Sequence, residues 1–86
     1  MTKIWADKAW DDYVAWQTED RKTLKRINAL IKDIERNGLF DGIGKPEPLK
    51  YRKAWSRRID QANRLVYDFD ENKNLLVIAC KGHYED

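Results

Sequence analysis

The amino-acid sequence predicts one α+β domain over residues 1–86, in which two antiparallel helices pack on a mostly antiparallel sheet. A clear helical period occupies residues 24–34, and two runs rich in β-branched and aromatic residues follow at 65–69 and 75–80. A chain of 86 residues buries only about 60% of its unfolded surface, which leaves room for one core. The 12% aromatic content argues against disorder, and the mean hydropathy of -0.86 argues against a membrane span.

The N-terminal segment predicts a short strand followed by a helix. Residues 3–5 have strand composition, and the helix is expected to begin near Asp7, whose carboxylate can cap the first helical amides. Three residues at helical spacing form the apolar stripe expected to face the core: Trp10, Tyr13 and Val14. Asp11 and Asp12 are then expected to face water, and Trp16 falls off the stripe.

The second helix has the clearest pattern in the sequence. Its apolar positions recur at intervals of three and four residues: Leu24, Ile27, Leu30, Ile31 and Ile34. The remaining positions are mostly charged or polar, so the segment predicts an amphipathic helix with one buried face. Asn37 and Gly38 are typical of the left-handed end of a helix.

The C-terminal half predicts a loop and three strands. Residues 38–48 contain three of the four glycines and both prolines, which predicts an ordered loop. Strands are expected at 55–60, 65–69 and 75–80, with a hairpin turn at 70–74. Along the first of these strands, two sets of residues alternate between the faces: Trp55, Arg57 and Ile59 against Ser56, Arg58 and Asp60.

Composition excludes several kinds of site. The single Cys80 and the single His83 cannot build a zinc site, and the glycines at 42–44 precede prolines instead of the helix that a phosphate loop needs. Acidic residues at the hairpin tip are typical of a solvated turn: Asp68, Asp70 and Glu71. The sequence therefore predicts no metal and no cofactor. The lone cysteine and the lack of an apolar leader predict a cytoplasmic protein.

Basic charge is concentrated in the middle of the chain. Residues 45–64 carry seven basic and two acidic side chains, a local net charge of +5 in a chain whose total is +2. Tyr51 and Trp55 lie in the same stretch. Cations beside aromatic rings favour nucleic-acid binding, because cations neutralise phosphates while rings stack on bases. The alternative is a solvated basic face.

Two positions could transfer protons. Glu47 lies between Pro46 and Pro48, which fix the backbone and display its carboxylate, although the same segment could be only a stiff loop. His83 and Tyr84 follow the last predicted strand and carry an imidazole and a phenol. Three arginines between these positions could hold a phosphate or form surface salt bridges: Arg57, Arg58 and Arg64.

Four ordered motifs carry a family resemblance. They are Pro-Glu-Pro-Leu-Lys at 46–50, Trp-Ser-Arg-Arg-Ile at 55–59, Arg-Leu-Val-Tyr at 64–67 and the closing His-Tyr at 83–84. The chain resembles the Txe/YoeB toxins of bacterial toxin-antitoxin systems, in the RelE/ParE superfamily, over nearly its whole length. The resemblance implies the RelE-like microbial RNase fold and a toxin that cleaves mRNA on the ribosome.

Position by position, the resemblance assigns roles to three residues. Glu47 matches the family's general base, Arg64 the arginine that stabilises the charged transition state, and His83 the general acid. In metal-free RNA cleavage a base removes the 2′-hydroxyl proton, the oxygen attacks phosphorus, and an acid protonates the departing 5′ oxygen. The resemblance therefore implies a metal-independent endoribonuclease.

Three further residues match supporting positions of the family. Lys50 and Arg58 match basic residues at the scissile region, and Tyr84 matches the tyrosine beside the catalytic histidine. The chain departs from the family at Asn63, where a histidine often stands, and an asparagine cannot titrate. Residues 51–53 lie in a shortened stretch without the expected glycine, so they are left outside the predicted site.

The resemblance also implies partners. These are a cognate antitoxin of the YefM/Axe type, the ribosome with its mRNA, and a second copy of the chain in a homodimer, with no membrane. Two other functions stay open from sequence: a member that blocks translation without cutting, and a ParE-like inhibitor of DNA gyrase. The gyrase inhibitors share the fold but not the set of Glu47, Arg64 and His83.

Overall fold

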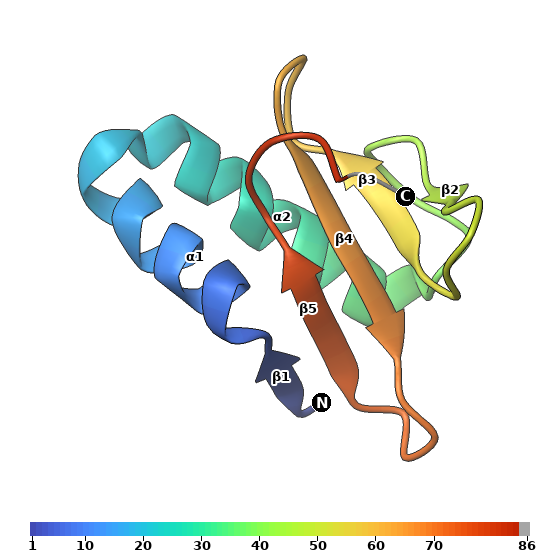
Figure 1. The fold of residues 1–86 in the computed structure, drawn as a ribbon. Helices are drawn as coiled ribbons and strands as arrows, with labels where there is room; N and C mark the ends of the chain where they lie inside the picture. The colour runs from blue at the N-terminus through green and yellow to red at the C-terminus, as the bar shows by residue number, and fades with distance from the viewer. Residues whose placement is uncertain (85–86) are drawn as a thin grey trace.

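The computed structural model describes residues 1–84, and over that range the chain forms two helices and a five-stranded sheet (Figure 1). The elements in chain order are β1 (Lys3–Trp5), α1 (Asp7–Glu19), α2 (Arg21–Asn37), β2 (Glu47–Pro48), β3 (Trp55–Arg58), β4 (Arg64–Phe69) and β5 (Leu75–Ala79). The predicted α+β class is confirmed. No helix within residues 1–84 is long and apolar enough to cross a membrane.

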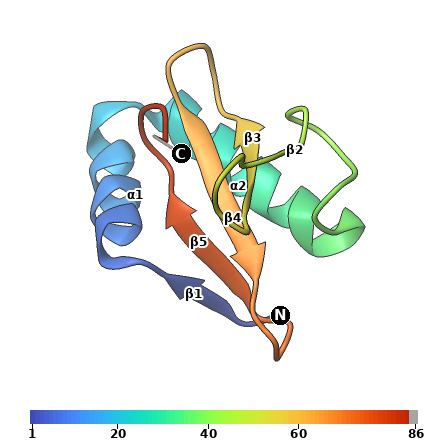
Figure 2. The same ribbon diagram turned by 45° about the vertical axis from the view of Figure 1, so that its right-hand side comes forward.

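The sheet has the strand order β1-β5-β4-β3-β2. β1 runs parallel to β5, with Lys3 opposite Leu75, and the other neighbouring strands are antiparallel. Both helices cover the same face of the sheet (Figure 2), and the core lies between them and the central strands. Side chains that point from β3 and β4 to the opposite face can therefore form a site away from the helices.

The packing of α2 confirms the sequence pattern. Four of the five predicted apolar positions are buried: Ile27, Leu30, Ile31 and Ile34. Leu24 packs against the core from a partly buried position. Asp20 caps the helix by accepting hydrogen bonds from the backbone amides of Lys22 and Thr23. The helix ends at Asn37, and Gly38 follows with a φ of +86°.

α1 packs through a different face from the predicted one. It begins at Asp7, but Ala6 occupies the N-cap position and no side chain caps the helix, so the predicted role of Asp7 is wrong. Of the predicted stripe, Tyr13 packs against the core, while Trp10 and Val14 are 48% and 44% exposed. The buried residues of the helix are instead Ala9, Asp12 and Trp16.

Two polar contacts pair the buried polar groups of α1. The indole Nε1 of Trp16 donates a hydrogen bond to the backbone oxygen of Cys80 at 3.1 Å, so this large ring is buried with its N–H satisfied. Asp12 accepts a hydrogen bond from Lys8 Nζ at 2.9 Å, so the buried carboxylate is paired. The partner of Trp16 lies at the other end of the chain, which a helical period cannot reveal.

β2 is a two-residue strand inside the segment that was expected to be a loop. Glu47 lies opposite Ser56 and Pro48 lies opposite Trp55, at the edge of the sheet. A proline cannot donate to a strand ladder, so it is tolerated at an edge. The loop prediction is wrong for these two residues because the pairing depends on β3, which lies further along the chain.

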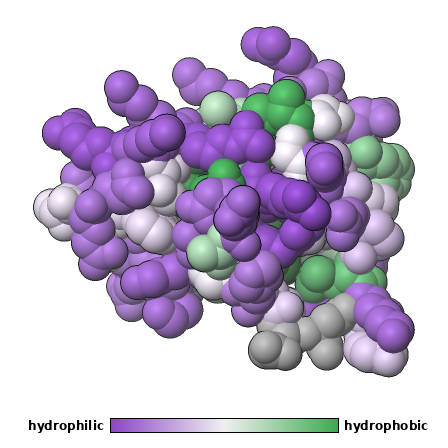
Figure 3. Space-filling view, turned by 90° about the horizontal axis from the view of Figure 1, so that it is seen from above, coloured by the Kyte–Doolittle hydropathy of each residue, from purple (hydrophilic) through white to green (hydrophobic). Residues whose placement is uncertain are grey.

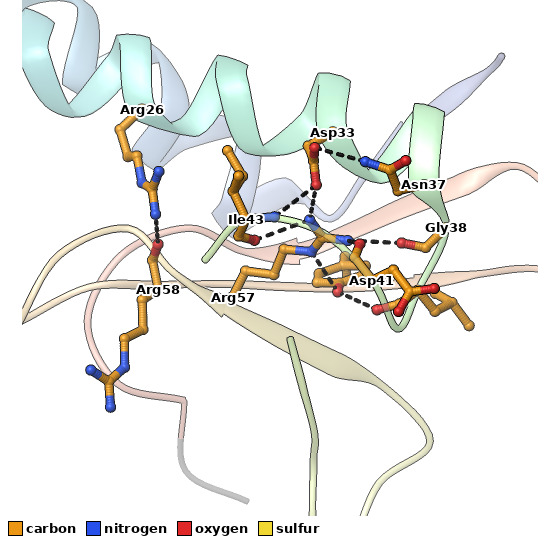
Figure 4. A network of polar contacts seen from close by, with 10 residues as sticks. Arg26, Asp33, Asn37, Gly38, Asp41, Ile43, Arg57 and Arg58 are labelled. Atoms are coloured by element: carbon orange, nitrogen blue, oxygen red, sulfur yellow. Dashed lines mark hydrogen bonds and ion pairs between the residues drawn. The ribbon is translucent and has the colours of Figure 1, made fainter. Parts of the chain in front are cut away.

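Arg57 is fully buried, and its guanidinium uses all five N–H donors (Figure 4). Nε donates to the Tyr67 hydroxyl at 2.9 Å, and Nη1 donates to the carboxylate of Asp33. The other bonds go to three backbone oxygens of residues 38–43: Ile43 at 3.1 Å, Gly38 at 2.8 Å and Asp41 at 2.6 Å. Both roles considered for Arg57 from sequence, a phosphate ligand and a surface salt bridge, are therefore wrong.

Asp33 completes this network from α2. Burial opposes ionisation of Asp33, but hydrogen bonds from Arg57 and from the Ile43 amide outweigh it and lower the pKa of the carboxyl. Gly42 passes so close that a Cβ there would lie 1.8 Å from Asp33 Oδ2, and its φ is +122°. The loop of residues 38–43 is therefore fixed to α2 by the Ile43 amide, which donates to Asp33, and by the bonds of its carbonyl oxygens to Arg57, which pairs with Asp33.

We expect Arg57→Met to lower the free energy of unfolding by about 3–5 kcal/mol, because Asp33 and three backbone oxygens lose their partner. The neighbouring Arg58 is exposed, so Arg58→Met is a matched control that should change stability by no more than about 0.5 kcal/mol. Urea unfolding followed by tryptophan fluorescence measures both values. Equal unfolding midpoints for the two variants would contradict this role of Arg57.

Candidate active site

Polar residues of β2, β3 and β4 lie close together on the face of the sheet that points away from the helices. Glu47 pairs across the strands with Ser56, and Arg58 pairs with Arg64. Alternate residues of a strand share a face, so Ser56 and Arg58 project to the same side. The antiparallel register therefore gathers Glu47, Ser56, Arg58 and Arg64 on one surface.

Arg64 is the centre of this group. Its Nη2 lies 3.7 Å from Glu47 Oε2, and its Nε and Nη2 donate to the Ser56 hydroxyl at 3.1 and 2.9 Å. Its backbone amide donates to the carbonyl oxygen of Gly82 at 3.1 Å, which brings His83 beside it. The side chain of Arg64 is 17% exposed and that of Glu47 is 56% exposed. A restrained cation therefore lies beside a solvent-accessible carboxylate.

An open cavity of about 430 Å³ lies next to Arg64. Arg26, Arg58, Arg64 and His83 are among the residues that line it. Arg26 reaches from α2 to donate to the backbone oxygen of Arg58 at 3.1 Å, while the Arg58 side chain points away from α2 (Figure 4). Three guanidinium groups around one cavity can bind a phosphate.

The arrangement offers three groups for chemistry on a phosphate ester. The carboxylate of Glu47 can accept a proton, the guanidinium of Arg64 can stabilise negative charge, and the imidazole of His83 can donate a proton.

The surface of the molecule seen from above in the view of Figure 1 is mostly hydrophilic (Figure 3). Within residues 1–84, no group of three or more His, Cys, Asp or Glu side chains could hold a metal ion.

The sequence matches the family model described as the YoeB-like toxin of bacterial type II toxin-antitoxin system over residues 5–84. The chain belongs to this family. The toxin is 49% identical over 86 residues to Toxin YoeB of Escherichia coli (strain K12), in an alignment that covers 98% of this chain and 100% of the relative. The family resemblance carried by the four motifs is thereby confirmed.

Two solved structures of relatives from Staphylococcus aureus share the fold of this toxin. A YoeB-YefM complex aligns with a TM-score of 0.89 at 42% identity, and a YoeB dimer aligns with a TM-score of 0.90 at 41% identity. Each alignment covers 98% of both chains. The two helices on a mixed five-stranded sheet are therefore the fold of these YoeB toxins.

Two residues that sequence reasoning did not single out contact residues of the candidate site. Ser56 is 4% exposed, and its hydroxyl orients the Arg64 guanidinium. The predicted alternation along β3 placed Ser56 on the same face as Arg58. Arg52, from the segment left outside the predicted site, donates to the hydroxyl of Tyr84. No local pattern could pair these two, because 32 residues separate them.

The remaining predicted residues lie around this centre. Lys50 is exposed in the loop after β2, with Nζ 5.3 Å from the ring centre of Tyr51. Tyr84 is half-buried, and the Arg52 guanidinium lies 5.8 Å from its ring centre. Tyr84 and His83 line a second cavity of about 500 Å³ together with three basic residues: Lys8, Arg52 and Lys81. His83 therefore lines both cavities, each of which also has basic residues in its lining.

Proposed function

We propose that this toxin is a ribosome-dependent endoribonuclease that cleaves mRNA and so inhibits translation in the cytoplasm. The observation that carries the proposal is the position of Arg64. Ser56 accepts hydrogen bonds from its guanidinium, which lies 3.7 Å from the Glu47 carboxylate. Its backbone amide bonds to Gly82, the residue before His83. A carboxylate, an oriented cation and an imidazole beside a cation-lined cavity are the groups that phosphodiester cleavage needs.

The proposed reaction needs no metal. Glu47 accepts the proton of the 2′-hydroxyl, and the freed oxygen attacks the adjacent phosphorus. Arg64 stabilises the negative charge that grows on the phosphate oxygens, with Arg58 and Lys50 beside the scissile region. His83 protonates the departing 5′ oxygen, so the products are a 2′,3′-cyclic phosphate and a 5′-hydroxyl. Each such proton transfer contributes roughly 10²- to 10⁴-fold to the rate.

The openness of the site supports a need for the ribosome. Glu47 is 56% exposed and the cavity beside Arg64 is open, so few contacts of the toxin itself can align a flexible RNA strand. Cleavage requires the 2′ oxygen, the phosphorus and the 5′ oxygen to lie nearly in line. A ribosome that holds the mRNA would supply this alignment, which is worth several orders of magnitude in rate.

One assay separates this function from its two alternatives. Purified toxin is added to cell-free translation, and mRNA ends are mapped by primer extension. Cuts in phase with codons support the endoribonuclease. Translation arrest with intact mRNA indicates a non-catalytic inhibitor of translation. Unaffected translation is the result expected of an inhibitor of DNA gyrase.

We expect Arg64→Ala and His83→Gln each to reduce cleavage by at least about 10²-fold, because both groups act on the transition state. The stability of His83→Gln should stay within about 0.5 kcal/mol of the parent because His83 is exposed, whereas Arg64→Ala also loses its hydrogen bonds to Ser56 and should lower the free energy of unfolding by about 1–2 kcal/mol. Ile31→Ala is the contrasting variant: its side chain is 5% exposed, and the cavity should cost about 2–5 kcal/mol. If the unfolding temperature falls equally in all three variants, Arg64 and His83 contribute to the stability of the fold and not to catalysis.

We expect cleavage of an RNA oligonucleotide to continue with EDTA in excess. Ribosomes themselves require Mg²⁺, so the test uses a free oligonucleotide at high toxin concentration and accepts a slow rate. Mass spectrometry should detect a 2′,3′-cyclic phosphate and a 5′-hydroxyl, and the matching DNA oligonucleotide should survive because it lacks the 2′-hydroxyl. A 3′-hydroxyl with a 5′-phosphate would exclude this mechanism.

We also propose that an antitoxin of the YefM/Axe type covers the region of Glu47, Arg64 and His83. The YoeB-YefM complex from Staphylococcus aureus supports such a partner, and the YoeB dimer supports self-association of the free toxin. The net charge of +5 over residues 45–64 favours an acidic, partly disordered segment that folds on binding.

The purified toxin-antitoxin complex is expected to cleave ribosome-bound mRNA more slowly than the free toxin, because the antitoxin covers the catalytic groups. Primer extension over a time course at equal toxin concentration measures the two rates. Equal rates would show that the antitoxin leaves this region open.

A further inference from the structure

Asn63 lies in the loop between β3 and β4, and its side chain bonds to two different segments. Its Nδ2 donates to both carboxylate oxygens of Asp60, at 3.0 and 3.1 Å. Its Oδ1 accepts from the backbone amide of Gly82 at 2.8 Å. The nitrogen faces a carboxylate and the oxygen faces an N–H, so only one orientation of the amide satisfies both partners.

Asp60 is itself held in place. Its Oδ1 also accepts from the backbone amides of Ala62 and Asn63, both at 2.8 Å. Burial opposes ionisation of Asp60, but the hydrogen bonds from the Asn63 side chain and from these two backbone amides outweigh it and lower the pKa of the carboxyl. The backbone oxygen of Asn63 accepts from the amides of Ile59 and Asp60 in return. The loop is therefore closed on itself and offers a rigid support.

Gly82 is held on both sides by two successive residues. Its amide bonds to the Asn63 side chain, and its carbonyl oxygen accepts from the Arg64 amide at 3.1 Å. The β4–β5 ladder ends at the pair of Val66 and Ala79, so these two bonds continue the contact beyond the sheet. Gly82 has a φ of +72°, a conformation that favours glycine. The next residue, His83, then lies at the cavity beside Arg64.

We propose that Asn63 is a positioning residue for His83. Asn63 donates to Asp60 and accepts from the Gly82 amide, and these hydrogen bonds hold the residue that precedes His83 in place. The role rests on the proposed function, because it matters only if His83 transfers a proton. With the Gly82 amide unbound, the C-terminal segment keeps fewer contacts and the imidazole can move. A displacement of about 1 Å can cost about 10²-fold in rate. Asn63 performs this role without titrating.

The test compares two alanine variants that each remove one asparagine-aspartate contact. Asn63→Ala removes the bond to Gly82. Asn74→Ala is the matched control, because Asn74 Nδ2 donates to Asp70 Oδ2 at 3.1 Å in the hairpin turn. That turn joins β4 to β5 at the opposite end of these strands from the loop of Asn63 (Figure 1).

Amide hydrogen exchange tests the contact itself, without any activity. We expect the Gly82 amide to exchange slowly in the parent toxin and about 2- to 13-fold faster in Asn63→Ala, the factor that one hydrogen bond supplies. Asn74→Ala should leave its exchange unchanged. If Gly82 exchanges equally fast in the parent and in Asn63→Ala, the contact does not exist in solution and the proposal fails.

Kinetics on ribosomes test whether the contact acts through His83. We expect Asn63→Ala to lower kcat by up to about 10²-fold with little change in KM, and to have no further effect in a His83→Gln background. Unchanged kcat in Asn63→Ala, or the same loss in both backgrounds, would overturn the positioning role. If His83→Gln cleaves as fast as the parent, the proposed function of His83 fails instead, while the exchange result still decides whether Asn63 holds Gly82.

Discussion

The buried guanidinium of Arg57 is the interaction on which the rest of the structure depends. A buried cation is stable only when its donors are paired, and the five donors of Arg57 join α2, β4 and the loop of residues 38–43. Residues 44–46 connect this loop to β2. The network in the core therefore helps to place Glu47, the proposed proton acceptor, at the edge of the sheet.

β3 serves both the core and the site through successive residues. Arg57 points toward α2, whereas Arg58 points away from it (Figure 4). Ser56 lies on the same face of the strand as Arg58. Ser56 in turn orients Arg64 on the neighbouring strand. A register shift of one residue would bury Ser56 or Arg58 in the core and expose Arg57, so the stability of the fold and the geometry of the site depend on the same strand alignment.

The sequence indicated the residues of the site but not how they meet. Motifs singled out Glu47, Arg64 and His83, and their catalytic roles stay predictions. Their proximity follows from the strand order, in which β2, β3, β4 and β5 are neighbours. Neither Ser56 nor Arg52 received a role from the sequence, because a hydroxyl and a surface arginine gain their roles only from Arg64 and Tyr84.

The sequence by itself determined α2, the two long strands and the hairpin between them, because apolar spacing and turn residues act over a few neighbouring positions. Only the tertiary structure decided the buried face of α1, the strand β2 and the burial of Arg57. Each depends on a distant partner: the Cys80 carbonyl oxygen for Trp16, β3 for β2, and Asp33 with the loop of residues 38–43 for Arg57. The cost of burying a polar group is set by the partner that it meets, and local patterns do not contain that partner.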